Sequence, residues 1–477
     1  MNLQYPSIHF LGIAGIGVSA LAQVAQARGV RVSGSDSGGG VLDNPAIQRL
    51  VRGGATVFEG HRAENLPADT ALVVASAAIP DSNPEVARAM AEGIRVVTRA
   101  EFLGELMRSH KGPKVAVAGT HGKTTTTGML GVILQEAGLD PTVFVGGEVP
   151  ELGGNVRIGA VNGPMVVEAC EAYDSFLSLK PDIAVITNIE ADHLDHFGSE
   201  ERVHASFEAF LANITPDGAL IACGDDPGVR AILDGGAGAR RLLEYGTGCR
   251  FYSGSRAKAV ELGERASFDW HSGPPAVRIT LSMPGMHNVL NALAAATAAS
   301  QLGADSEAIA AGLAAFHGAR RRLDLLGETG AGDTRVLVFD DYAHHPTEIR
   351  ATREALRTAY PRHRLLAVFQ PHLYSRTRDF LDDFAAELAG FDAFIVTEIY
   401  AAREAPIPGV LAADIVNQAI KVRTGLTALY VPAQADIPAM TEALCAPGDV
   451  IVFMGAGDIR MQAEIFAARL QQPVSAG

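Results

Sequence analysis

The residues best suited to chemistry lie in segment 114–130, which reads K-V-A-V-A-G-T-H-G-K-T-T-T-T-G-M-L. A short apolar run leads through Gly119 and Gly122 into Lys123 and Thr124, and a helix-compatible stretch follows. Glycines let backbone N–H groups approach phosphate oxygens, while a lysine supplies positive charge and a threonine hydroxyl can bind Mg²⁺. The segment therefore predicts a phosphate-binding loop.

The common spacing of such loops, G-x-x-x-x-G-K-T, would require a glycine where Val117 stands. The chain instead matches a shorter form, G-T-H-G-K-T-T. An ordinary turn between a strand and a helix is the alternative. Four consecutive threonines argue against it, because threonine is a poor residue for a helix interior.

Acidic residues and a histidine follow the next two predicted strands, at 165–167 and 183–186. Because the carboxyl ends of parallel strands meet at one edge of a sheet, we expect them near the phosphate loop. Glu168 with Thr124 suits one Mg²⁺ ion. His193 is a candidate ligand for a second ion, or a structural histidine at a strand end. Whether Glu171 and Asp174 serve the site or are solvated loop charges stays open.

A glycine-rich turn near the N-terminus suggests a second ligand site. An apolar run at 8–11 is followed by Gly12, Gly15 and Gly17, and then by an alanine-rich helix that ends near residue 28. Asp36 closes the next apolar run, about where a ribose-binding acid would fall. The spacing of these glycines also satisfies the dinucleotide-binding fingerprint. The alternative is that the glycines only allow a tight turn where the helix packs against the strand.

Two further polar loops follow the predicted strands at 336–339 and 365–369. The first reads D-D-Y-A-H-H-P and contains His344, and the second reads Q-P-H-L-Y-S-R-T-R and contains Arg376. Arg376 can bind a carboxylate or a phosphoryl oxygen with two hydrogen bonds, and His344 can donate to a substrate. We expect the two loops to meet, although the double histidine also admits a purely structural role.

The strands and helices that would position these residues group into three α/β domains in series. Strand and helix patterns predict an N-terminal Rossmann-like domain at 1–108, a central P-loop ATPase-like domain with a mostly parallel sheet at 113–318, and a C-terminal Rossmann-like domain at 322–477. Lys111, Gly112 and Pro113 form the first linker. Short alternating runs between about 240 and 283 predict a small antiparallel patch.

Composition narrows the class of protein. The 477 residues carry 39 Lys plus Arg against 54 Asp plus Glu, and this net charge of -15 argues against a general nucleic-acid or anionic-membrane surface. The four cysteines are widely spaced and fit reduced thiols better than disulfides. No apolar run is long enough to span a membrane. We therefore expect a cytoplasmic protein, as a monomer or weak homodimer, that does not bind nucleic acid and does not insert into a membrane.

Five motifs together resemble the Mur ligases. In chain order they are G-T-H-G-K-T-T, N-I-E-A-D-H-L-D, G-M-H-N-V-L-N, D-D-Y-A-H-H-P-T-E and F-Q-P-H-L-Y-S-R-T. The similarity extends over nearly the whole chain, from His9 to Asp458. It implies an ATP-dependent ligase of peptidoglycan precursor synthesis that joins L-alanine to the lactyl carboxylate of UDP-N-acetylmuramate through an acyl phosphate.

The resemblance also implies roles for individual residues. Lys123, His344 and Arg376 would be catalytic. ATP would contact Gly119, Thr120, His121, Gly122, Lys123, Thr124, Thr125, Asn291, Arg321 and Asp340. The nucleotide sugar would contact Gly12, Gly15, Gly17, Ser35, Asp36 and Ser76. The amino acid would contact Tyr342, His344 and Arg376. Mg²⁺ would be bound by Thr124, Glu168 and His193.

Three departures from the family pattern bear on the substrate. No lysine lies between Lys180 and Lys258, so the carbamylated lysine of several Mur ligases has no counterpart, which favours the alanine-adding branch or the peptide-recycling ligase. Cys170 replaces a common aspartate, and Leu373 stands where many alanine-adding sequences have arginine. The recycling ligase is the first alternative. An NAD-dependent dehydrogenase and a nucleotide-dependent switch are the others, but neither gives a role to all these motifs.

Overall fold

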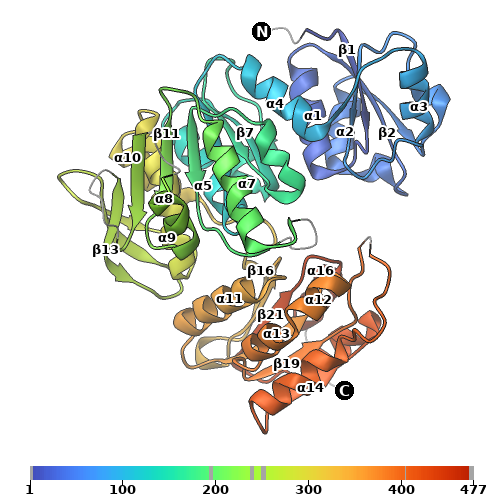
Figure 1. Cartoon of the computed structure of the whole chain (residues 1–477). Coiled ribbons are helices and arrows are strands. Elements are labelled where there is room, and N and C mark those ends of the chain that lie inside the picture. Colours follow the sequence, from blue (N-terminus) through green and yellow to red (C-terminus); the bar gives the residue numbers. More distant parts are fainter. Residues whose placement is uncertain (1–3, 193–196, 237–240, 249–253, 403, 472–477) are drawn as a thin grey trace. The chain divides into compact units, whose positions relative to one another are not determined.

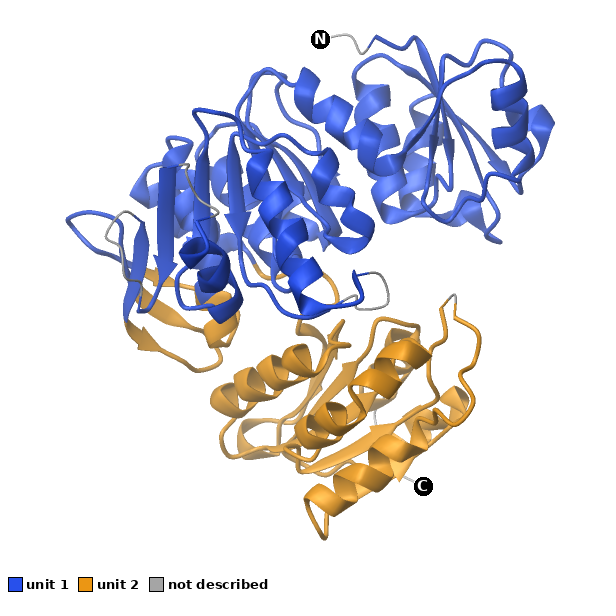
Figure 2. Cartoon of the chain, viewed as in Figure 1, with its two compact units in different colours: residues 1–258, 269–278, 290–316 blue, residues 259–268, 279–289, 317–477 orange. Residues whose placement is uncertain are grey.

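A computed structural model describes residues 4–192, 197–236, 241–248, 254–402 and 404–471. These residues form two compact units, coloured separately in Figure 2. Unit 1 comprises 1–258, 269–278 and 290–316, and unit 2 comprises 259–268, 279–289 and 317–477. The architecture is α/β with three sheets, as the sequence predicts.

The N-terminal sheet has five parallel strands in the order β3-β2-β1-β4-β5, with helices on both faces (Figure 1). Its strands are β1 (Ser7–Leu11), β2 (Arg31–Asp36), β3 (Thr56–Glu59), β4 (Leu72–Ala75) and β5 (Val96–Thr98). Its helices are α1 (Ile16–Ala27), α2 (Pro45–Arg52), α3 (Pro84–Ala91) and α4 (Arg99–Ser109). The order reverses at β1, so ligands of such a sheet bind at the carboxyl ends of β1 and its neighbours.

The central sheet has ten strands in the order β15-β14-β13-β12-β11-β10-β6-β9-β7-β8. They are β6 (Lys114–Ala118), β7 (Thr142–Val149), β8 (Gly154–Arg157), β9 (Met165–Glu168), β10 (Ile183–Ile186), β11 (Ala219–Cys223), β12 (Arg241–Gly246), β13 (Ser255–Glu261), β14 (Ser267–His271) and β15 (Val277–Thr280). The helices are α5 (Lys123–Glu136), α7 (Glu200–Ala212), α8 (Pro227–Asp234), α9 (Met286–Gln301) and α10 (Ser306–Ala315). Strand β6 lies parallel between β9 and β10, which brings the ends of all three together.

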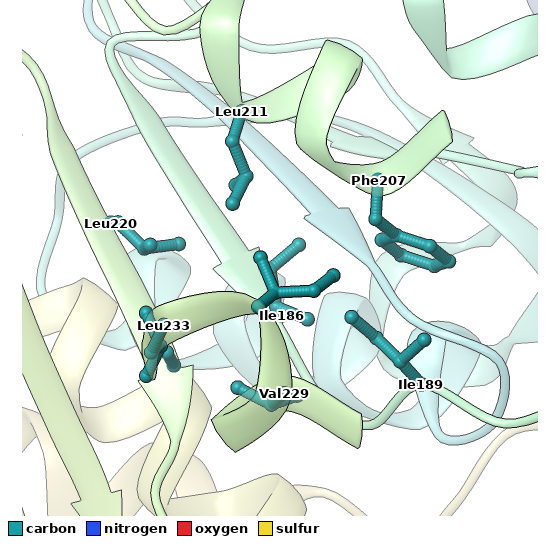
Figure 3. A pocket seen from close by; sticks show the side chains of 9 residues that line it. Ile186, Ile189, Phe207, Leu211, Leu220, Val229 and Leu233 are labelled. Atoms are coloured by element: carbon teal, nitrogen blue, oxygen red, sulfur yellow. The ribbon is translucent and has the colours of Figure 1, made fainter. Parts of the chain in front are cut away.

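One face of this sheet packs against α7 and α8. Figure 3 shows Phe207 and Leu211 of α7 and Val229 and Leu233 of α8 pointing toward Ile186 of β10. The small pocket among them is lined by apolar side chains alone. The contact therefore fixes the carboxyl end of β10 by hydrophobic burial, without polar groups.

The third sheet, in unit 2, has the order β16-β17-β21-β18-β19-β20, and only its edge strand β16 is antiparallel. The strands are β16 (Asp324–Thr329), β17 (Val336–Asp341), β18 (Arg364–Phe369), β19 (Ala393–Val396), β20 (Thr427–Tyr430) and β21 (Asp449–Met454). The helices are α11 (Pro346–Ala359), α12 (Tyr374–Asp379), α13 (Leu381–Leu388), α14 (Ala413–Val422), α15 (Ile437–Leu444) and α16 (Ile459–Leu470). Strand β21 separates β17 from β18, so the loops after these two strands lie at one edge.

Short 3₁₀ segments complete the described secondary structure: η1 (Val41–Asp43), η2 (Ala63–Asn65), η3 (Pro150–Leu152), η4 (Ala172–Ser178), η5 (Gly332–Thr334) and η6 (Gln434–Asp436). Among the residues that the structure describes, no helix combines the length and apolar character needed to cross a membrane.

Candidate active site

The phosphate loop joins the buried strand β6 to α5, the layout that the sequence predicts. Gly119 and Gly122 have φ values of 137° and 81°, a region that favours glycine. A Cβ at Gly119 would lie 2.0 Å from Oγ1 of Thr187, and one at Gly122 would lie 2.5 Å from Oδ1 of Asn291. Both glycines are thus required by backbone conformation and by close packing.

The segment that follows β10 supports the loop through Thr187 and Asn188. The Asn188 side chain accepts a hydrogen bond from the His121 N–H at 2.8 Å and donates one to the His121 carbonyl at 3.0 Å. The Thr187 hydroxyl donates to the same carbonyl at 2.6 Å. On the other side of His121, the Thr120 hydroxyl accepts from the Glu190 N–H at 2.9 Å. The loop is therefore held in shape by its neighbours in the sheet.

Lys123 begins α5, and its Nζ donates to the carbonyls of Gly119 and Thr120 at 2.6 and 2.8 Å. Nζ also lies 2.9 and 2.8 Å from the two carboxylate oxygens of Glu171. Burial alone lowers the pKa of Lys123, but the negative charge of Glu171 outweighs it and raises the pKa. The lysine is therefore positively charged at neutral pH, as phosphate binding requires.

Glu171 is not a solvated loop charge. Only 3 % of its surface is exposed, and it pairs with Lys123. Asp174 is half-buried and accepts a hydrogen bond from the Ser206 hydroxyl, so the solvated alternative is wrong for it as well. The sequence left both alternatives open because a polar loop after a strand does not show which of its acids turn inward.

Thr124 and Glu168 meet at the start of α5. The Thr124 hydroxyl donates to Oε1 of Glu168 at 2.9 Å, and the Gly146 N–H donates to Oε2 at 2.5 Å. A carboxylate beside a hydroxyl supplies the hard oxygen ligands that Mg²⁺ prefers, so these residues fit the ion. His193, the other predicted ligand, lies outside the described residues.

The remaining predicted ATP residues of unit 1 lie on α5 and α9. Thr125 is buried on the first turn of α5. Asn291 accepts a hydrogen bond from Thr126 at 3.2 Å and lies against Gly122, so the structure places it at the phosphate loop. Its contact with ATP stays a prediction.

At the N-terminal sheet, Gly12 has a φ of 74° and donates its N–H to the Ser35 carbonyl at 2.9 Å. The Asp36 carboxylate accepts from the N–H groups of Ala14 and Gly38 at 3.0 and 3.1 Å. Asp36 therefore shapes the glycine turn itself. Ser35 is fully buried, so its side chain supports this edge from beneath, and its contact with the nucleotide sugar stays a prediction.

The other predicted residues of this edge lie around the same turn. Gly15 donates its N–H to the Gly12 carbonyl at 3.1 Å, and Ser76 lies 3.0 Å from where a Cβ at Gly12 would be. A Cβ at Gly17 would lie 3.2 Å from Nη1 of Arg99. Sequence reasoning missed Arg99, although its place directly after β5 marks it as a residue of this edge.

In unit 2, the two buried carboxyl groups Asp340 and Asp341 end β17. Asp340 accepts from Arg460 at 2.9 Å and lies 3.6 Å from Nε of Arg321. Burial raises the pKa of Asp340 to about 6, against the opposing pull of Arg321 and Arg460. Burial likewise raises the pKa of Asp341 to about 6. Arg321 also donates to the carbonyls of Gly455 and Gly457, at 2.7 and 3.0 Å, so β17 and β21 both hold it.

An aromatic and cationic cluster lies at the same edge of unit 2. The guanidinium of Arg321 lies 4.7 Å from the ring centre of Tyr342, and this ring contacts that of His344 at 5.2 Å. The rings of His344 and His372 are 5.8 Å apart, so the loops after β17 and β18 meet as expected. Arg376, only 7 % exposed, places Nη1 3.4 Å from Nδ1 of His372. These groups can bind an amino-acid carboxylate by charge and hydrogen bonds.

His344 and His345 have different environments. His344 places Nδ1 2.8 Å from the Tyr342 carbonyl and 3.1 Å from Glu348. His345 caps α11 by accepting from the Thr347 N–H at 3.4 Å. The purely structural role considered for the double histidine therefore applies to His345, which caps the helix. His344 instead belongs to the aromatic cluster.

Three family descriptions match the chain in sequence. The catalytic domain of the Mur ligase family matches residues 7–111, the Mur ligase middle domain matches 117–299, and the Mur ligase glutamate ligase domain matches 321–457. The chain belongs to the Mur ligase family.

Curated relatives and solved structures agree with this assignment. The chain is 43 % identical to a UDP-N-acetylmuramate--L-alanine ligase of Salinibacter ruber, over 97 % of this chain and 95 % of the relative. It is 44 % identical to the UDP-N-acetylmuramate--L-alanine ligase of Mycobacterium sp. strain JLS, with the same coverage of both chains. The solved UDP-N-acetylmuramate-alanine ligase of Thermotoga maritima superposes with a TM-score of 0.79 and 29 % identity, covering 98 % of this chain and 99 % of that one. A solved murein peptide ligase of Psychrobacter arcticus superposes with a TM-score of 0.69 and 26 % sequence identity, covering 98 % of this chain and 99 % of that one. Membership of this Mur ligase family leaves the dehydrogenase alternative without support.

Proposed function

We propose that this Mur ligase joins L-alanine to the lactyl carboxylate of UDP-N-acetylmuramate, with hydrolysis of ATP to ADP and phosphate, in peptidoglycan precursor synthesis. Near-full-length identity of 42 to 44 % to UDP-N-acetylmuramate--L-alanine ligases of several genera carries the proposal. A cytoplasmic location follows from the use of ATP and a nucleotide sugar as substrates.

Unit 1 provides the phosphate chemistry in this proposal. The N–H groups at the start of α5 and the charged Nζ of Lys123 bind phosphate oxygens and neutralise the charge that develops on them. Thr124 and Glu168 would hold Mg²⁺, which as a Lewis acid polarises the phosphoryl group. The phosphate loop and its neighbours thus favour transfer of the terminal phosphoryl group.

Unit 2 provides the groups for the amino acid. Arg376 pairs with the alanine carboxylate, while His344 and Tyr342 position the amino group from the adjacent loop. The imidazole of His344 is held by the Tyr342 carbonyl and by Glu348, which limits its orientation.

The chemistry has two balanced steps. The lactyl carboxylate oxygen attacks the terminal phosphorus of ATP, forming an acyl phosphate as the bond to ADP breaks. The neutral amine of alanine then attacks the acyl carbon, inorganic phosphate leaves with the C–O bonding pair, and the amine loses one proton to form the amide.

The test is phosphate release measured with each component left out. Release is expected only when ATP, UDP-N-acetylmuramate and L-alanine are all present, because the acyl phosphate needs both an acceptor carboxylate and an amine. Undiminished release without the nucleotide sugar would overturn the proposal.

A muramyl peptide-recycling ligase is the second candidate, because a murein peptide ligase shares the fold at 26 % identity. The same assay separates the two candidates when L-alanine is replaced by a murein tripeptide. Faster turnover with the tripeptide than with L-alanine would favour recycling.

A further inference from the structure

Glu85 is a completely buried carboxyl group at the start of α3, with no part in the chemistry described above. Its hydrogen-bond donors come from β1, from β2 and from the segment that follows β3. His9 of β1 donates to it at 2.6 Å, Ser35 of β2 at 2.8 Å, and Nδ1 of His61, which follows β3, lies 3.2 Å away. The Arg62 N–H donates at 3.2 Å. One carboxylate therefore connects β1, β2 and the segment after β3.

The charge state of Glu85 follows from these donors. Burial raises its pKa, but the hydrogen bonds from His9, Ser35 and His61 outweigh burial and lower the pKa below its ordinary value. Glu85 is therefore an ionised acceptor, and each group around it must donate. For His61 this places the proton of the neutral ring on Nδ1 and leaves Nε2 as an acceptor.

His61 connects this buried network to the surface. Its side chain is 15 % exposed, whereas that of Glu85 is 0 % exposed. Within the described part of the chain, Nε2 of His61 has no protein partner, while Nδ1 faces Glu85 and Ser35 at 3.2 and 2.9 Å. An acceptor with a fixed tautomer thus lies at the carboxyl edge of the sheet.

Ser35 connects the network to the glycine turn. Its carbonyl accepts the N–H groups of Gly12 and Ile13 at 2.9 and 3.2 Å, while its hydroxyl donates to Glu85. The next residue, Asp36, accepts the Gly60 N–H through its carbonyl at 2.7 Å. Removing the charge on Glu85 therefore disturbs both the turn before α1 and the loop that carries His61.

Stability alone does not account for this arrangement. Burying an ionised carboxylate is costly, and well-packed apolar residues of similar volume often stabilise a fold equally or better. Two of the donors lie near the edge at which parallel sheets of this order bind ligands, since Ser35 is close to the carboxyl end of β2 and His61 follows β3. The common feature of the network is its position under that edge.

We propose that Glu85 is a positioning residue for the nucleotide sugar, acting through Ser35 and through His61, whose Nε2 accepts a hydrogen bond from an N–H or O–H group of that substrate. This inference rests on the proposed function, because it assigns the N-terminal edge to UDP-N-acetylmuramate. The substitution Glu85→Gln keeps the shape of the side chain but removes the charge and one acceptor oxygen.

The experiment compares Glu85→Gln with wild type in steady-state kinetics with each substrate varied in turn. The KM for UDP-N-acetylmuramate should rise about tenfold or more, while kcat and the KM values for ATP and L-alanine change less than about threefold. Ser7→Ala is the matched control. This buried hydroxyl donates to the Asp69 carbonyl at the opposite edge of the same sheet and should leave all three KM values unchanged.

A second variant covers the case in which Glu85→Gln does not fold. His61→Ala removes a partly exposed ring and should also raise the KM for the nucleotide sugar, and in a folded double variant the two effects should be less than additive. An unchanged KM in His61→Ala, or a folded Glu85→Gln with equal losses for all three substrates, overturns the inference. Absence of wild-type turnover with UDP-N-acetylmuramate instead overturns the proposed function.

Discussion

The hydroxyl of Thr124 donates a 2.9 Å hydrogen bond to Glu168, which joins the first turn of α5 to the end of β9. In the proposed reaction these two side chains would hold Mg²⁺. We expect Thr124→Val to lower kcat/KM by about 10²- to 10³-fold and to raise the Mg²⁺ concentration needed for half-maximal phosphate release, because it removes one hard ligand. Thr124→Ser should keep most of the activity.

Thr127→Val is the control for that prediction. Thr127 lies on the same helix, fully buried, and within the described residues its hydroxyl has no hydrogen-bond partner. The change should leave activity and Mg²⁺ dependence as in wild type. An equal effect in both variants would mean that Thr124 acts through helix packing.

Lys123→Met should lower turnover by about three orders of magnitude or more, because the lost charge stabilises the transferring phosphoryl group. The single change removes the cation that pairs with the buried Glu171 and should destabilise the fold. Lys123→Met with Glu171→Gln should restore thermal stability and stay inactive. Lys114→Met, at the other end of β6, should keep activity, since Lys114 pairs with Asp182. Recovery of turnover in the double variant would argue against the catalytic role.

Gly122→Ala should abolish ATP turnover, because its φ is 81° and the new Cβ would lie 2.5 Å from Asn291. Gly138→Ala provides the comparison, since Gly138 has a φ of 70° but no atom within 4 Å of the added Cβ. Gly138→Ala should lose only about 1 kcal/mol of stability and remain active. Titration with a fluorescent ATP analogue, together with thermal unfolding, distinguishes the two effects.

The third domain should lose stability as the pH rises from about 4 to about 6. The folded pKa of Asp341 is about 6, above the ordinary value of 3.8. The folded state therefore binds the Asp341 proton more tightly than the unfolded state does. The resulting contribution to the free energy of unfolding, about 3 kcal/mol at most, is fully present below pH 4 and is lost as the pH rises to about 6. Asp341→Asn should show a flatter dependence on pH.

The measurement is hydrogen exchange of peptides from β17, β18 and β21, corrected for the intrinsic effect of pH on exchange. Because the protein has several domains, exchange resolved by peptide is more informative here than a single unfolding curve. Parallel pH curves for wild type and Asp341→Asn would contradict the assigned pKa.

The positions of strands were predicted well from the sequence where an apolar run is followed by a loop of glycine or polar residues. The run at 183–186 coincides with β10, and the loops with His344 and Arg376 meet as expected. Such loops are readable because glycine spacing and polar residues after buried strands have few structural explanations.

The partners of these residues were not readable from the sequence. The pairing of Lys123 with Glu171 spans 48 positions, and the donors named around Glu85 lie 23 to 76 positions from it. Neither spacing follows a helix or strand period, so only the packing of separate strands brings these groups together. The burial of Ser35 was missed for the same reason, since a serine at a strand end reads as exposed.

Helix α5, which carries the phosphate loop, is covered by parts of the chain that are synthesised much later. Asn291 lies against Gly122, a Cβ at Gly128 would lie 2.8 Å from Phe316, and one at Gly312 would lie 2.5 Å from Ile133. When only the first 258 residues have left the ribosome, α9 and α10 have not yet been released to pack against α5 and the phosphate loop. We therefore expect the nascent chain to bind ATP only after α9 and α10 have left the exit tunnel, and chaperones to bind the apolar residues of α5 until then.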